Sequence, residues 1–152
     1  MHALNRILTP GRTACQISTA SKKRLFETIA EIVSADQSTL PYTEVLDNLV
    51  ARENLGSTGL GQGIAIPHCR VSDCPEPLGA LISLETAIPF DAPDEQPVDL
   101  LFVLLVPEEA DQEHLDILAS IASLFNQPDF CAQLRRADSD AALYSAATAS
   151  ED

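Results

Sequence analysis

The sequence predicts an α/β domain in which helices cover a β-sheet. Strand-like apolar segments alternate along the chain with segments of helical periodicity, which is typical of this class. One strand-like segment contains an uninterrupted apolar run, 100–106, as expected of a central strand covered on both faces. A length of 152 residues with 45% hydrophobic residues suits a single domain with its own core.

The first elements are a short strand and a helix. Residues 13–17 predict the strand, with Cys15 and Ile17 on one face. Ser21 is a suitable N-cap for the helix that follows. The apolar residues of this helix recur at helical spacing, at Leu25, Ile29, Ile32 and Val33.

A second helix and a short strand follow. The helix is expected over 43–54, and Gly56 stands at the place of a helix C-terminal glycine. Its expected buried residues are Val45, Leu46, Leu49 and Val50. The strand is expected over 64–66 and is closed by Pro67.

The second half of the chain predicts two longer strands and then helices only. The strands are expected over 78–84 and 98–106, with a proline-containing loop between them. Helices are expected over 112–125, 130–137 and 141–147. Ser139 is a suitable cap for the last of these.

The charge of the chain argues against two classes of partner. With 23 acids and nine bases, the net charge is −14, whereas nucleic acids and anionic membranes attract clustered Lys and Arg. Between Glu53 and Asp129 the only base is Arg70, so positive charge is scarce there. We expect the remaining acidic surface to suit a partner with a basic docking face.

We expect a cytoplasmic protein. The apolar run 100–106 is far shorter than the ~20 residues of a membrane span. Arg6 and Arg12 interrupt the N-terminal region before any apolar stretch of signal-peptide length. The four cysteines are therefore expected to stay reduced.

A glycine-rich segment is the first candidate site. Four of the six glycines, Gly56, Gly59, Gly61 and Gly63, lie within eight residues. Such a segment, which includes Ser57 and Thr58, can direct several backbone N–H groups at phosphate oxygens. It does not match a P-loop, because no Lys follows these glycines, or a dinucleotide fingerprint, because the spacing differs and a strand follows.

His68 follows the strand expected after this segment and allows two interpretations. It could cap the strand end as a structural histidine. It could instead be a neutral nucleophile, with backbone donors and Arg52 or Arg70 meeting the developing negative charge. Arg52 could equally be a surface arginine favoured by the C-terminus of its helix.

His114 lies in the first turn of the helix expected over 112–125, for which Asp111 is a suitable N-cap. Its spacing places it on the core-facing stripe, so the residues alone favour a buried structural histidine. The alternative pairs it with His68 around a phosphoryl group, with His68 as acceptor. A zinc site is not expected, because His68, Cys69 and Cys74 do not have a standard zinc spacing.

The segment 52–68, RENLGSTGLGQGIAIPH, resembles the phosphorylation-site signature of the type-2 IIA proteins. These are components of the bacterial phosphoenolpyruvate-dependent phosphotransferase system, of the fructose/mannitol class. Further matches follow at 88–92 (IPFDA), 96–102 (QPVDLLF), 105–107 (LVP), 114–115 and 118–119. Within the family the chain is most similar to the nitrogen-regulatory branch, over residues from about 7 to 147.

The resemblance implies a mixed β-sheet covered by helices on both faces, in a single domain over 1–152. It implies that His68 accepts a phosphoryl group from the phosphohistidine of an HPr-like carrier, which enzyme I of the nitrogen branch supplies. His114 matches the family's second active-site histidine, and Arg52 its arginine before the glycine segment. No cofactor or metal is implied. The implied targets are regulatory proteins such as potassium transporters or sensor kinases.

Two other functions remain open at this point. The chain could be the IIA component of a fructose- or mannitol-type sugar transport system. It could also be a pure binding module in which the histidines are structural. One departure from the family pattern is Cys69, where relatives commonly have glycine. Its thiol could touch the acceptor site, but we expect a harmless substitution.

Overall fold

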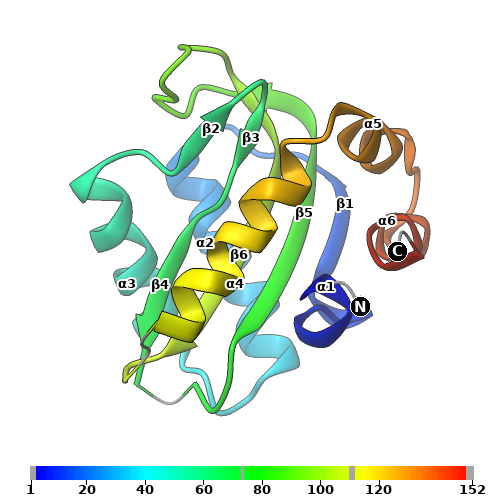
Figure 1. Ribbon diagram of the computed structural model, residues 1–152. Coiled ribbons are helices and arrows are strands. Elements are labelled where there is room, and N and C mark those ends of the chain that lie inside the picture. The colour runs from blue at the N-terminus through cyan, green and yellow to red at the C-terminus, as the bar shows by residue number, and fades with distance from the viewer. Residues whose placement is uncertain (1–2, 73, 110–111, 150–152) are drawn as a thin grey trace.

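The computed structural model describes residues 3–72, 74–109 and 112–149, without the side chains of residues 3, 112–114 and 149. It is an α/β domain built on one mixed six-stranded sheet (Figure 1). The strands are β1 (Thr13–Ile17), β2 (Gly59–Gly61), β3 (Ile64–Ala65), β4 (His68–Val71), β5 (Leu78–Ile88) and β6 (Val98–Pro107). The helices are α1 (Ala3–Ile7), α2 (Lys22–Asp36), α3 (Tyr42–Leu55), α4 (Gln112–Phe125), α5 (Pro128–Arg136) and α6 (Asp140–Ala149), with a 3-10 turn η1 (Pro10–Arg12).

Strand β6 is central, as its apolar sequence predicts. The strand order is β1-β5-β6-β3-β2, and β4 also pairs with β6. The pairing of β6 with β5 is antiparallel, whereas β3 and β4 lie parallel to successive parts of β6. The predicted mixed sheet is therefore confirmed. Both β3 and β4 are joined to the sheet through their pairing with β6.

Helices cover both faces of the sheet, which explains why β6 is apolar on both sides. Helices α2 and α3 pack on one face, against alternate β6 residues such as Leu101 and Val103. Helices α1, α4, α5 and α6 pack on the other face, against Leu100 and Phe102. In Figure 1, α4 crosses in front of the sheet and α2 lies behind it. The two hydrophobic cores are separated by the sheet itself.

Helix signals in the sequence were reliable where a cap and an apolar stripe coincide. The Ser21 hydroxyl accepts a hydrogen bond from the Arg24 amide, so it caps α2 as predicted. The Ser139 hydroxyl does the same for the Ala142 amide at the start of α6. The predicted bounds of α4 are confirmed, although Asp111, its expected cap, lies outside the described residues.

The prediction that Cys15 and Ile17 share a face is wrong. The register of β1 on β5 shifts between Ala14 and Ile17, and Gln16 has a positive φ of 52°. This bulge breaks the alternation of side chains. Cys15 therefore packs against the α4 side of the sheet and Ile17 against the α2 side.

In the part of the chain that the structure describes, no helix combines the length and apolar character that crossing a membrane requires.

Candidate functional site

His68 does not follow the end of a strand, as expected, but is the first residue of another strand. The strand predicted over 64–66 is interrupted at Pro67, and His68 begins a new strand, β4. Its Cα pairs with that of Leu104 in β6, and the Pro67 carbonyl accepts a hydrogen bond from the Leu104 amide at 2.9 Å. His68 therefore belongs to the sheet, and the central strand fixes its backbone.

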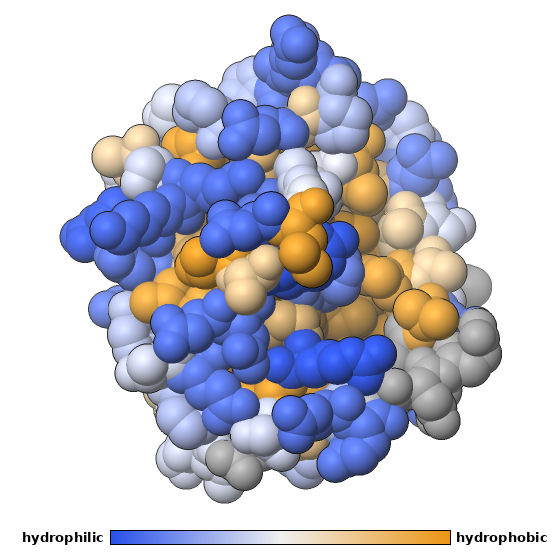
Figure 2. Space-filling model, turned by 90° about the vertical axis from the view of Figure 1, so that its left-hand side faces the viewer, coloured by the Kyte–Doolittle hydropathy of each residue, from blue (hydrophilic) through white to orange (hydrophobic). Residues whose placement is uncertain are grey.

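A pocket of about 650 Å³ lies beside His68, between α3, β4, β6 and α4. Its walls are largely apolar, with the polar side chains of Asn48, Arg52, Arg70 and Glu108 among them. The lining residues are Asn48, Ala51, Arg52, Leu55, His68, Cys69, Arg70, Leu104, Val106, Glu108, Leu115 and Leu118. Figure 2 shows apolar surface gathered in a hollow on the side of the molecule that α3 borders. Leu55 and Leu115 are 84% and 57% exposed, which is unusual for leucines and leaves an apolar rim open to a partner.

The imidazole of His68 is held in one orientation. Its Nδ1 lies 2.8 Å from the Ile66 carbonyl oxygen, and since a carbonyl only accepts, Nδ1 is assigned the proton. The other ring nitrogen, Nε2, then carries a free lone pair. Burial lowers the pKa of His68, and the Arg52 cation lowers it further, whereas the Ile66 hydrogen bond and Glu53 raise it. The net effect favours a neutral nucleophile.

We predict that the midpoint of the His68 titration lies below pH 6.5, the ordinary pKa of histidine, so that the ring is mostly neutral at pH 6.5. Since the pKa in the folded state lies below the unfolded value, the unfolded chain binds more protons near pH 6.5, and acidification through that value lowers stability. An NMR titration of the imidazole resonances measures the pKa directly. A midpoint above 6.5 would contradict the prediction.

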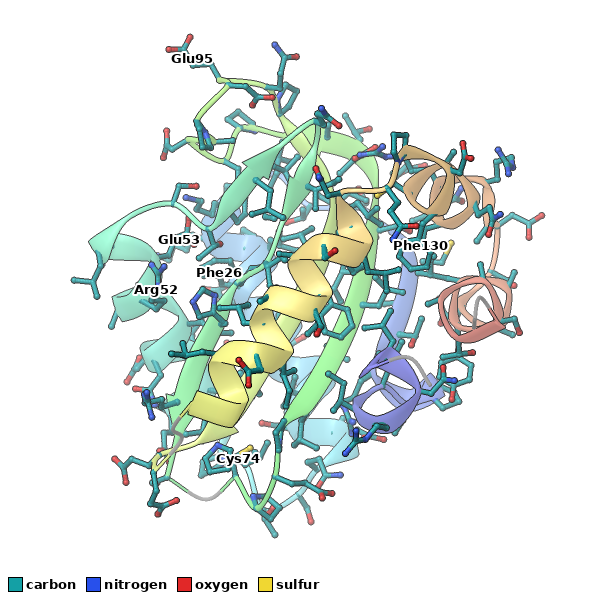
Figure 3. The ribbon with its side chains drawn as sticks, viewed as in Figure 1. Phe26, Arg52, Glu53, Cys74, Glu95 and Phe130 are labelled. Atoms are coloured by element: carbon teal, nitrogen blue, oxygen red, sulfur yellow. The ribbon has the colours of Figure 1, made fainter. Side chains whose placement is uncertain are left out.

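Arg52 and Glu53 lie in the last turn of α3 (Figure 3). Arg52 lines the pocket, and its Nη1 donates to the Gly56 carbonyl at 2.9 Å. Glu53 is buried, and its carboxylate accepts from the Thr58 amide and, at 2.7 Å, from the Thr58 hydroxyl. The Lys22 ammonium lies 2.8 Å from the same carboxylate.

The sequence analysis did not identify Glu53 as a buried residue, although its position on α3 indicates it. Glu53 continues the buried stripe of α3 at a spacing of four residues after Val45 and Leu49. A carboxylate on such a stripe needs partners. Through them it fixes the entry to the glycine-rich segment against α2 and α3.

The glycine-rich segment lies outside the lining of this pocket, and its binding of phosphate remains a prediction. Among the described residues, none of the lining belongs to Gly56, Ser57, Thr58, Gly59, Gly61 or Gly63. Strands β2 and β3 form an antiparallel hairpin, with positive φ at Gly61, Gln62 and Gly63. The amides of Thr58, Gly59 and Gln62 donate to Glu53, Ser57 and Asp94. Because these donors are used within the chain, the glycines shape a turn here.

Two further predicted site residues can be placed in part. Arg70 lines the pocket, and its Nη1 donates to the Glu108 carbonyl at 3.1 Å. His114 lies in the first turn of α4, the helix that supplies Leu115 and Leu118 to the pocket. The side chain of His114 lies outside the described residues.

Cys69 lines the pocket but is buried, and burial raises the pKa of its thiol to about 12. Burial also raises the pKa of the Cys74 thiol to about 11. Both groups are therefore protonated thiols at neutral pH, which disfavours metal binding and nucleophilic attack. Over the described residues, no group of three or more His, Cys, Asp and Glu side chains is arranged to hold a metal ion.

We predict that Cys69 in the folded protein does not react with iodoacetamide at pH 7.5. A protonated, buried thiol is a poor nucleophile. Mass spectrometry after timed alkylation measures the reaction, with the denatured protein as the positive control. Modification of Cys69 at the rate of a free thiol would contradict this prediction.

The chain was compared with known protein families, sequences and structures. Residues 6–148 match the family described as phosphoenolpyruvate-dependent sugar phosphotransferase system, EIIA 2. A nitrogen regulatory protein of Pseudomonas aeruginosa is 49% identical over 144 residues, 95% of this chain and 94% of that protein. A nitrogen regulatory protein of Escherichia coli is 45% identical, over 97% of this chain and 88% of that protein.

Solved structures show the same fold. The nitrogen regulatory protein IIA-Ntr of Neisseria meningitidis matches with a TM-score of 0.87 and 40% identity, over 95% of this chain and 99% of that chain. The mannitol IIA of Escherichia coli shares the fold at a TM-score of 0.74 and 15% identity, over 92% of this chain and 98% of that chain. With a family match over nearly all its length and close nitrogen regulatory relatives, the chain belongs to the EIIA 2 family of the phosphoenolpyruvate-dependent sugar phosphotransferase system.

Proposed function

We propose that this protein is a phosphoryl-accepting regulatory protein of the nitrogen branch, and that His68 is the acceptor. The observation that carries the proposal is the state of the His68 ring. Its Nδ1 proton is held by the Ile66 carbonyl, burial favours the neutral form, and Nε2 is left to attack. The pocket beside it offers Arg52 and Arg70 to a group that brings negative charge.

The chemical step is a transfer between two imidazoles. The Nε2 lone pair of His68 forms the new P–N bond, and the P–N bond to the carrier's histidine breaks. The electron pair of that broken bond stays on the carrier's imidazole. Nδ1 of His68 keeps its proton, and the carrier's ring leaves as a neutral imidazole because its other ring nitrogen is protonated when the P–N bond breaks. Since one phosphoimidazole replaces another, the transfer is reversible, and catalysis consists of positioning and charge stabilisation.

The donor would be a small HPr-like phosphocarrier of the nitrogen-related kind, charged by its own enzyme I. The exposed leucines Leu55 and Leu115 flank the His68 pocket and give such a carrier an apolar contact. A net charge of −14 favours a carrier with a basic docking face. This exchange would take place in the cytoplasm.

Phosphorylation would change what the protein binds. A phosphoryl group adds nearly two negative charges beside an apolar rim, which is enough to weaken one docking contact and create another. The proposed targets are regulatory proteins, among them potassium transporters and sensor kinases.

The test is incubation of the protein with phosphoenolpyruvate, enzyme I and the carrier, each component omitted in turn. We expect the mass of one phosphoryl group to appear only in the complete mixture, and peptide mapping to place it on His68. No uptake from either a nitrogen-type or a sugar-type carrier would favour a pure binding module. Onward transfer to a fructose- or mannitol-type IIB protein would favour a sugar-transport role.

We also propose that His114 assists the transfer, because α4 places it in the turn before the pocket residues Leu115 and Leu118. The expected result for His114→Ala is a folded protein that binds the carrier with unchanged affinity and accepts phosphate about 10²-fold more slowly. Rapid-quench transfer assays and calorimetric titration with the carrier measure the two quantities. An unchanged transfer rate would leave His114 a structural role.

A further inference from the structure

Helix α3 contacts the free edge of β4 through side chains spaced four residues apart. The Asn48 side-chain amide donates to the Arg70 carbonyl at 2.8 Å. One turn earlier, the Glu44 carboxylate accepts from the Ser72 amide at 2.9 Å and from its hydroxyl at 2.7 Å. Both hydrogen bonds lower the pKa of Glu44, and the one from the Ser72 hydroxyl has the larger effect.

Helix α3 and strand β4 advance by similar distances between successive contacts. Four residues of α-helix advance about 6.0 Å, and two residues of a strand about 6.6 Å. Contacts connect Glu44 with Ser72 and Asn48 with Arg70, and the same spacing places Arg52 opposite His68 at the next step. Arg52 and His68 line the same pocket, which agrees with this third step.

The backbone of β4 explains why its alternate residues face the helix. In a parallel pair, alternate residues direct their backbone groups to opposite sides. The Pro67 carbonyl bonds to the Leu104 amide of β6. The Arg70 carbonyl and the Ser72 amide instead form hydrogen bonds with side chains of α3. The helix thus takes the place of a missing neighbouring strand at this edge.

We propose that Asn48, supported by Glu44, is a positioning residue that holds the end of α3 beside β4 and keeps Arg52 next to His68. The proposal rests on the proposed function, in which His68 is the phosphoryl acceptor. Asn48 does not anchor the helix to the protein, because Val45 and Leu49 are fully buried in the core. It sets where the last turn of α3 lies along the strand.

The test uses two variants that remove the amide donor, Asn48→Ala and Asn48→Leu. Both introduce better helix formers, and leucine keeps the branching and the number of side-chain heavy atoms, so folding is expected to survive. Asn54→Ala is the matched control, since Asn54 is the same residue type on the same helix and is exposed. Transfer from the phosphorylated carrier and the pKa of His68 are measured in each protein.

We expect both Asn48 variants to lower kcat about tenfold with little change in KM, because a misplaced charge weakens transition-state stabilisation more than docking. The pKa of His68 should rise, as we also expect in Arg52→Ala, because the Arg52 cation is no longer held near the ring. Among the described side chains, the other charged groups around His68 are Glu53, Arg70 and Glu108. The Asn54→Ala control should match the wild type.

The double variant Asn48→Ala/Arg52→Ala separates positioning from other effects. If Asn48 acts through Arg52, the double variant transfers phosphate no more slowly than Arg52→Ala alone. A further loss in the double variant, or unchanged kcat and pKa in both single Asn48 variants, would overturn the inference. Failure of the wild type to accept phosphate would instead refute the proposed function, while the pKa comparison would still decide the role of Asn48.

Discussion

The His68→Ala variant takes up no phosphoryl group from the phosphorylated carrier. The substitution removes the Nε2 lone pair, and the described side chains that line the pocket offer no comparable nucleophile. Cys69 is the next candidate in the pocket, but it is buried, and burial raises the pKa of its thiol to about 12. Arg52 and Arg70 are permanently protonated and cannot attack phosphorus. Intact-mass spectrometry after incubation with the complete relay measures the result.

The matched control is His2→Ala, which removes a histidine from the N-terminal segment. This variant is expected to gain the full mass of one phosphoryl group at the wild-type rate. Circular dichroism of His68→Ala should match that of the wild type, because the side chain is only partly buried. A phosphoryl group on folded His68→Ala would assign the acceptor role to another residue.

Several elements could be predicted from the sequence because their causes are local. The bounds of α4 follow from its apolar stripe, and Ser21 and Ser139 cap helices with their own hydroxyls. The centrality of β6 follows from its apolar run, since only a strand covered on both faces is so composed. The assignment of Arg52 to the His68 site came from the family signature, since the residues alone left Arg52 either as a charge partner of His68 or as a surface arginine.

The rest depends on partners that are distant along the chain. The amides of the glycine-rich segment were expected to face phosphate, but those of Thr58 and Gln62 donate to Glu53 and Asp94, and Asp94 lies in the β5–β6 loop. The bulge at Gln16 cannot be inferred from β1 alone, because it arises in the register with β5. His68 was placed after a strand because Pro67 interrupts the pattern, whereas β6 continues past it and pairs with β4.

The buried cation Arg12 is the largest feature that the sequence analysis missed. Its side chain is 2% exposed, and its guanidinium donates to the Ile7 carbonyl at 2.7 Å and the Gly79 carbonyl at 2.8 Å. The third contact is an ion pair with Asp36 at the end of α2. One residue thus connects α1, the start of β5 and α2.

Asp36→Ala is expected to lower the free energy of unfolding by about 3–5 kcal/mol, because it leaves the buried guanidinium without a counter-charge. Urea denaturation followed by far-UV circular dichroism measures the change. The control is Glu27→Ala on the same helix, which breaks the more exposed Arg24–Glu27 pair and should cost no more than about 0.5 kcal/mol.

The double variant Arg12→Leu/Asp36→Ala tests the cause of this loss. If the unpaired charge is the cause, removing Arg12 as well should restore part of the stability, although the carbonyls of Ile7 and Gly79 then lose their donor. The double variant would then unfold at a higher urea concentration than Asp36→Ala alone. The contrary result is a loss of unfolding free energy in the double variant that equals the sum of the losses in Arg12→Leu and Asp36→Ala. It would show that Arg12 and Asp36 act independently, and that packing stabilises the region around Arg12.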